Sequence, residues 1–129
     1  MPREHLRVFV PLAYMFALFS LSSIPGDISS DNLVEKAFQW VTPNWQNLLH
    51  VPVYAGLATC WLWALRAYPL QSHTYLASAF VLTLLWAIAD ETYQLSVPGR
   101  YGSLTDLALN ALGAFLAVMY ARRVATRLS

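Results

Sequence analysis

Four stretches of apolar residues, separated by shorter polar segments, dominate the pattern of the chain. They run from about Val8 to Ile24, Leu48 to Leu65, Thr74 to Ala89 and Leu104 to Ala121. Each is close to the ~20 residues that a helix needs to cross about 30 Å of hydrocarbon. A backbone in lipid must satisfy its own hydrogen bonds, and these stretches lack the alternation of barrel strands, so we expect helices. The pattern predicts an all-α fold, an integral membrane four-helix bundle with helices at about residues 6–24, 47–66, 73–95 and 104–122.

The longest polar segment, between the first and second apolar stretches, contains a weaker helical pattern. It opens with the turn signal Pro25–Asp27, and Asp31 can cap a short helix from Asn32 to Trp40. The apolar positions of that helix recur at helical spacing, and Trp45 follows it. We therefore expect a short interfacial amphipathic helix on the outer membrane surface. An ordinary loop packed on the bundle is the alternative.

Composition agrees with a membrane protein. The chain is 57% hydrophobic and 12% charged, with a mean hydropathy of +0.45, whereas an average soluble domain carries about 25% charged residues. The net charge of +1 favours no nucleic acid partner. Cys60 is the single cysteine, which excludes an intrachain disulfide and a zinc site built on thiolates.

The distribution of basic residues predicts an orientation. With the N-terminus inside, Lys36 and Arg100 alone face outward, and six arginines face the cytoplasm. These six are Arg3, Arg7, Arg66, Arg122, Arg123 and Arg127. Both termini are then cytoplasmic. The first apolar stretch, with arginines before it and small residues after it, is also compatible with a cleaved signal peptide, but three remaining spans would leave less to pack together.

Polar residues concentrate at the predicted outer ends of the third and fourth helices. Asp90 and Gln94 share one face of the third helix, with Glu91 about 100° round from Asp90. After a Pro-Gly turn comes Arg100, the only cation of this hairpin. Carboxylates near a membrane are costly, so we expect Arg100 to bridge one of the nearby acids, or to bind a phosphate or carboxylate of a ligand.

The fourth helix opens on a second group of polar residues. Ser103 and Asp106 have the spacing of a capping box, with Asp in place of Glu or Gln. Asp106, Asn110 and Gly113 form a stripe along one face, and Gly113 would let another helix approach closely. Such intramembrane polar residues often mark a functional site, although they can also serve as hydrogen-bonding contacts between helices.

The first two helices send polar groups to the same depth. Ser20, Ser22 and Ser23 end the first helix, and His50 and Tyr54 open the second. All four helices therefore contribute to one polar face, which we predict to be a ligand-binding site. The candidate residues are His50, Tyr54, Asp90, Glu91, Gln94, Arg100, Ser103, Asp106 and Asn110.

The run from Asp90 to Gly113 resembles the main signature of the VanZ-like family, in the spacing D-E-x-x-Q, then P-G-R, then S-x-x-D-x-x-x-N-x-x-G. Ser22–Gly26, His50 and Tyr54 are weaker matches. The family consists of small bacterial membrane proteins named for a member linked to low-level teicoplanin resistance. The resemblance implies one VanZ-like transmembrane domain over residues 1–129, in the bacterial cytoplasmic (inner) membrane, and no particular reaction.

The sequence departs from the family at one point. Family members commonly carry an Asp-Lys pair three to four residues before the histidine, where this chain has Gln46 and Asn47. If the family's lysine binds an anion, this chain must use Arg100 in its place or do without such a residue.

Three functions fit these observations. The first is binding or handling of a lipid-linked or amphiphilic ligand at the outer face of the bacterial envelope, with membrane lipid as the other partner. The second is a membrane-embedded enzyme acting on a lipid-linked substrate, with His50 as general base and a carboxylate as acid or nucleophile, although no known catalytic motif is present. The third is a structural or accessory subunit.

The sequence leaves cofactor and assembly open. Carboxylates and an imidazole suit a divalent cation, but the pattern does not lead us to expect one. An ion transporter fits less well, because transport sites lie near the bilayer midplane. Nothing in the pattern sets the oligomeric state.

Overall fold

The structure is a computed structural model that describes residues 5–26 and 47–128. Four α-helices make up most of it, and one short 3-10 helix, η1 (His5–Val8), leads into the first. The α-helices are α1 (Phe9–Ser22), α4 (His50–Leu65), α5 (Ser72–Gln94) and α6 (Leu104–Leu128). The predicted all-α four-helix architecture is confirmed. The predicted amphipathic helix at Asn32–Trp40 lies outside the described residues.

Among the described residues, three helical segments are long and apolar enough to cross a membrane. They are His5–Ser22, Ser72–Gln94 and Leu104–Arg127. The remaining helix, α4, has 16 residues. It therefore rises about 24 Å, less than the ~30 Å of a typical hydrocarbon core. Pro52 lies in its first turn and Pro11 in that of α1, where a missing backbone N–H costs little.

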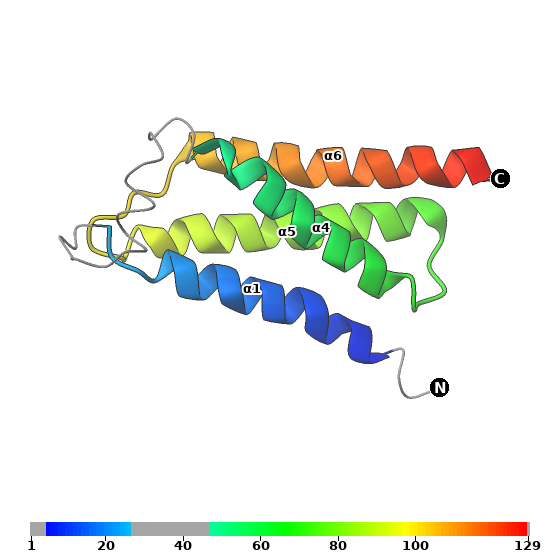
Figure 1. Ribbon diagram of the computed structural model, residues 1–129, viewed down its shortest axis with the longest axis horizontal. Helices are drawn as coiled ribbons and strands as arrows, with labels where there is room; N and C mark the ends of the chain where they lie inside the picture. The colour runs from blue at the N-terminus through cyan, green and yellow to red at the C-terminus, as the bar shows by residue number, and fades with distance from the viewer. Residues whose placement is uncertain (1–4, 27–46, 129) are drawn as a thin grey trace.

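The helices form a bundle in which α4 occupies the centre. Figure 1 shows α4 crossing α5 obliquely, from beside α6 at one end of the bundle toward α1 at the other. The first residues of α1 and the last residues of α6 lie at the same end, together with the connection between α4 and α5. The starts of α4 and α6 and the ends of α1 and α5 therefore meet at the opposite end, which we call the polar end.

Burial follows the central place of α4. Leu57, Ala58 and Ala64 of this helix have no exposed surface, and Trp61 is only 7% exposed. The outer helices instead expose many large apolar side chains, such as Phe16 at 71%. Exposed apolar surface on this scale is expected where lipid, rather than water, surrounds the helices.

Close packing between α4 and α6 depends on Gly113. A Cβ atom added there would collide with the backbone oxygen of Val51 and would lie 3.0 Å from the carbonyl carbon of Val51 and 3.1 Å from the amide nitrogen of Ala55. Because these are backbone atoms, no side-chain rotation could relieve the collision. The predicted close approach of another helix at Gly113 is confirmed, and the partner is α4.

The main difference from the predicted bounds is at the C-terminal end. The apolar stretch suggested an end near residue 122, whereas α6 continues to Leu128. Residues such as Ala, Arg and Leu have high helix propensity, and Arg127 in the last turn interacts favourably with the helix dipole. A helix therefore need not end where its apolar span ends.

Candidate functional site

Polar side chains from all four helices meet at the polar end of the bundle, as the sequence predicted. They form two hydrogen-bonded groups rather than one. The first group joins α4, α5 and α6 and contains His50, Glu91, Ser103, Asp106 and Asn110. The second joins α1, α4 and α5 and contains Ser22, Tyr54, Asp90 and Gln94.

The first group is organised around Asn110, which has no exposed surface. The amide nitrogen of Asn110 donates to Oε1 of Glu91 at 3.2 Å, and the amide oxygen lies 2.8 Å from Nδ1 of His50. The second carboxylate oxygen of Glu91 accepts the backbone N–H of Ser103 at 3.1 Å. These two bonds satisfy both carboxylate oxygens of Glu91 within the protein, where its side chain is only 6% exposed.

These bonds define which imidazole nitrogen of His50 is free. The Asn110 amide donates to Glu91 through nitrogen, so its oxygen faces His50 and can only accept. Nδ1 must then carry the hydrogen. In neutral His50, Nε2 is left with a lone pair that can bind a proton or a metal.

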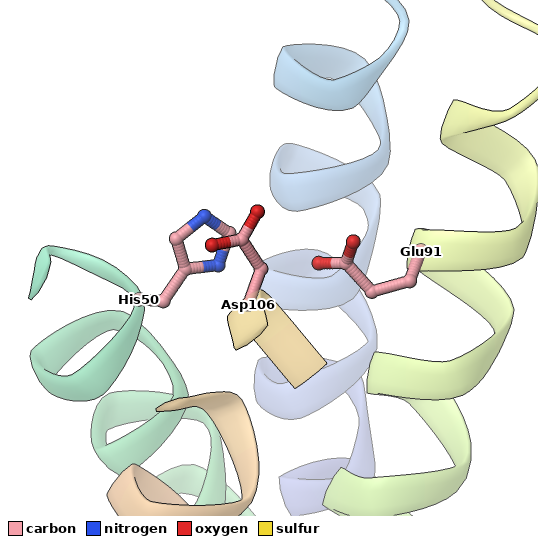
Figure 2. Close-up of side chains that lie close together, drawn as sticks. All are labelled: His50, Glu91 and Asp106. Atoms are coloured by element: carbon pink, nitrogen blue, oxygen red, sulfur yellow. The ribbon is translucent and has the colours of Figure 1, made fainter. Parts of the chain in front are cut away.

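Asp106 completes the first group from the start of α6. One ligand atom each of His50, Glu91 and Asp106 lies within 4.8 Å of the others. Figure 2 shows the His50 ring and the Glu91 carboxylate on opposite sides of the Asp106 carboxylate. We call these three side chains the His-Glu-Asp cluster. Oδ1 of Asp106 is buried and accepts no hydrogen bond from residues 5–26 or 47–128.

Local sequence explains how Asp106 is presented. The Ser103 hydroxyl accepts the backbone N–H groups of Thr105 at 3.1 Å and Asp106 at 3.4 Å, so Ser103 caps α6 as its spacing predicted. Just before it, Gly102 packs on the backbone oxygen of Glu91, where a Cβ atom would collide. The loop therefore brings the first turn of α6 close to the end of α5.

The second group is more completely enclosed. The Tyr54 hydroxyl donates to Oδ2 of Asp90 at 3.1 Å, and the Gln94 amide lies 3.4 Å from both that oxygen and the Ser22 hydroxyl. All four side chains are at most 8% exposed. The other oxygen of Asp90, Oδ1, is buried without a hydrogen-bond partner. The predicted shared face of Asp90 and Gln94 is thus used to tie α1, α4 and α5 together.

Arg100 bridges none of Asp90, Glu91 and Asp106, so this expectation is wrong, whereas its alternative role in binding a ligand anion stays a prediction. Its Nε donates to the backbone oxygen of Ile24 at 2.9 Å, and an Nη donates to that of Leu21 at 3.3 Å. The last carbonyl groups of a helix lack partners within the helix, and Arg100 supplies donors to the end of α1. Over residues 5–26 and 47–128, no Lys or Arg forms an ion pair with Asp90, Glu91 or Asp106.

Two further contacts, which the sequence did not predict, join the end of α1 and the residues just after it to the hairpin of α5 and α6. The Tyr93 hydroxyl lies 3.1 Å from the Ser23 hydroxyl, and the Tyr93 ring packs on Phe19 at 4.7 Å between centroids. The backbone of Gly26 donates to the oxygen of Pro98 at 3.0 Å. The Pro-Gly turn was visible in the sequence, but no pattern there indicated that α1 would pack on it.

All candidate residues except Arg100 therefore fall into one of the two groups, while their role in binding a ligand remains a prediction. The helices and their polar end define a multi-pass membrane protein with an ionisable cluster between three helices. The family model VanZ/LLP1 matches residues 8–125, and the chain belongs to this family. Neither a curated protein nor a solved structure matches it.

Proposed function

We propose that this membrane protein of the VanZ type binds the polar headgroup of a lipid-linked or amphiphilic molecule at the polar end of its bundle. One observation carries the proposal. Three chemically reactive side chains from three helices converge within 4.8 Å, and a buried oxygen of Asp106 accepts no hydrogen bond from the part of the chain that the structure describes. A buried carboxylate oxygen without a partner is costly, and a bound headgroup that brings a donor or a positive charge would remove that cost.

The surroundings of the His-Glu-Asp cluster suit the apolar part of such a molecule. Large apolar side chains at the polar end are exposed, with Tyr101 at 84% and Leu104 at 85%. Together with them we define an apolar collar: Ile24, Leu48, Leu49, Leu95, Tyr101 and Leu104. An amphiphile could rest its chain on this collar while its headgroup reaches the cluster, without leaving the membrane surface.

The distribution of charge supports an orientation for the proposed function. Arg7, Arg66, Arg122, Arg123 and Arg127 all belong to the end opposite the His-Glu-Asp cluster. Basic residues favour the cytoplasmic side, so we place the cluster on the extracytoplasmic face of the bacterial inner membrane and both termini in the cytoplasm. A ligand of the outer leaflet or the envelope would then reach the cluster directly.

The test compares the lipids that purify with the protein. Wild type, Asp106→Asn and Glu91→Gln are expressed, purified in a mild detergent and extracted, and the bound amphiphiles are identified by mass spectrometry. We expect the two cluster variants to lose at least one amphiphile class by fivefold or more. Glu4→Gln is the matched control, because it makes the same chemical change at a carboxylate that belongs neither to the cluster nor to the candidate residues.

Two results would contradict the proposal. Equal amounts of the same amphiphiles in wild type and both cluster variants would leave only a structural role for the cluster. If the variants instead held an intact lipid-linked species and wild type held a cleaved form of it, the cluster would perform a reaction and the chain would be an enzyme. Folded variants with elution profiles like wild type are required for either comparison.

A further inference from the structure

The spacing of the His-Glu-Asp cluster is close to that of a metal site. Two ligands of one ion lie at most about 4.2 to 4.4 Å apart, because metal–nitrogen and metal–oxygen distances are about 2.0 to 2.2 Å. One ring nitrogen of His50 and one carboxylate oxygen each of Glu91 and Asp106 already lie within 4.8 Å of one another. A movement of about half an ångström at the ends of these side chains, which rotations of the carboxylates can supply, would bring them into range.

The residue behind the cluster has the role expected of a partner that orients metal ligands. A metal-binding histidine usually donates its second ring N–H to a carbonyl or carboxylate, which fixes the ring and the tautomer. Asn110 accepts from Nδ1 of His50 at 2.8 Å and at the same time donates to Glu91 at 3.2 Å. One buried side chain thus orients two of the three ligands and leaves Nε2 of His50 free.

Charge gives the third argument. The cluster contains two carboxylates, and Arg100, the cation nearest in sequence, uses its donors on the backbone of α1. One carboxylate oxygen, Oδ1 of Asp106, is buried without a partner. Two carboxylates that share a confined site repel each other, and a cation between them would turn that repulsion into attraction.

We propose that His50, Glu91 and Asp106 bind one divalent transition-metal ion, of the kind represented by Mn²⁺ or Zn²⁺. Mixed imidazole and carboxylate ligands favour such ions over Mg²⁺ and Ca²⁺, which prefer oxygen ligands alone. Three protein ligands leave coordination positions open for an outside group. The inference deepens the proposed function and rests on it for the open positions, which would receive an oxygen of the headgroup, such as that of a phosphate.

Metal binding is tested without any lipid. Protein purified in detergent is stripped with EDTA and titrated with Mn²⁺, and free Mn²⁺ is followed by electron paramagnetic resonance. We expect one Mn²⁺ per chain and its displacement by Zn²⁺, which binds such ligands more tightly. Pulsed measurements should show coupling of bound Mn²⁺ to one imidazole nitrogen, lost in His50→Gln and kept in His5→Gln and His73→Gln.

Variants locate the site. Asp106→Asn and Glu91→Gln should each weaken Mn²⁺ binding by more than tenfold, and Asn110→Leu by about 10- to 100-fold, since it removes the orienting bonds. Glu4→Gln, which neutralises a carboxylate outside the candidate residues, should bind as wild type does. Wild type that binds neither Mn²⁺ nor Zn²⁺ in a one-to-one ratio would overturn the inference, and so would an equal loss in Glu4→Gln and Asp106→Asn, which would indicate loose attraction to acidic residues.

A last comparison separates the ion from the proposed function. The amphiphile content of wild type is measured before and after EDTA treatment in detergent. Release of the amphiphile by EDTA supports both the ion and its contact with the headgroup. Metal binding with an amphiphile content that neither EDTA nor Asp106→Asn changes supports the ion and contradicts the proposed function. Amphiphile binding that depends on Asp106, in a protein that binds no metal, supports the function and overturns the ion.

Because Asn110→Leu or a ligand variant could fail to fold, the imidazole coupling of wild type labelled with [15N]histidine provides a test that needs no ligand substitution.

Discussion

The contact between α4 and α6 at Gly113 leads to a quantitative prediction for Gly113→Ala. The new Cβ atom would collide with the backbone oxygen of Val51 and crowd the amide nitrogen of Ala55 at 3.1 Å. Ordinary contact requires the two helices to move apart by about 1 Å. Overpacking of this kind costs about 1–3 kcal/mol, and the higher helix propensity of Ala returns up to about 1 kcal/mol. With the full propensity term subtracted, we therefore expect a net loss of about 1 kcal/mol and of no more than about 2 kcal/mol.

The same movement should reach the candidate site. His50 is the residue next to Val51, and its Nδ1 lies 2.8 Å from Oδ1 of Asn110 on α6. A separation of about 1 Å would stretch this contact beyond hydrogen-bonding distance. Gly113→Ala should thus weaken Mn²⁺ binding as well as stability, although Gly113 touches none of the three proposed ligands directly.

Gly56→Ala is the matched control for this prediction. A Cβ atom at Gly56 would lie 2.7 Å from the Tyr14 hydroxyl, the far end of a side chain that can move. The displaced hydroxyl would lose its 2.9 Å bond to Val53, worth about 1 kcal/mol, which the helix propensity of Ala offsets. Unfolding by sodium dodecyl sulfate in mixed micelles, followed by tryptophan fluorescence, measures both variants. Equal stabilities of the two variants would refute the role given to the α4–α6 backbone contact.

Three further substitutions separate stability from binding. Arg100→Gln removes the donors to the backbone oxygens of Ile24 and Leu21, so it should lower Tm, at a cost of about 1–2 kcal/mol. Mn²⁺ binding should be unchanged, and a loss of Mn²⁺ binding would mean that Arg100 acts at the site. Tyr54→Phe removes the hydroxyl that donates to buried Asp90 and should lower the free energy of unfolding in detergent by about 1–3 kcal/mol. An unchanged free energy of unfolding would show that water satisfies Asp90 instead. Ser103→Ala removes the cap of α6 and should cost about 1 kcal/mol, whereas Ser103→Asn, which keeps a capping oxygen without adding a charge beside Glu91, should retain most of the stability.

The sequence predicted the helices and their shared polar end because both are local properties. Apolar stretches of spanning length mark the helices, and the serine at the start of α6 caps the helix wherever the rest of the chain lies. Even Gly113 could be assigned to a close helix contact, since a glycine in a polar stripe has few other uses. None of these inferences required knowledge of which helix packs on which.

The partners of individual polar residues could not be predicted, because they depend on the rotation and tilt of whole helices. Asp90 and Glu91 are neighbours in the sequence, yet one faces Tyr54 of α4 and the other faces Asn110 of α6. We expected Arg100 to bridge a carboxylate because a sequence shows the charged residues near it but not the backbone carbonyl groups that lie near it in the fold. The carbonyl groups at the end of α1 attract the same guanidinium, but every helix ends in such groups, so they leave no signal.

The helix ends around the His-Glu-Asp cluster explain how two carboxylates tolerate this position. Glu91 accepts the backbone N–H of Ser103 at the start of α6, and Asp106 lies in the first turn of that helix. The start of α4 is close by, since it carries His50. Each helix start has the effect of roughly half a positive charge, so two of them offset about one of the two negative charges.

The remaining charge distinguishes the proposed ion from a purely structural cluster. If the helix ends alone balanced the carboxylates, added Mn²⁺ would leave the stability of both wild type and Asp106→Asn unchanged. If an ion supplies the rest, wild type should gain about 2.7 kcal/mol when Mn²⁺ is present at a hundred times its Kd, and Asp106→Asn should lose that gain. A stability of wild type that is the same in EDTA and in saturating Mn²⁺ would show that the helix ends suffice.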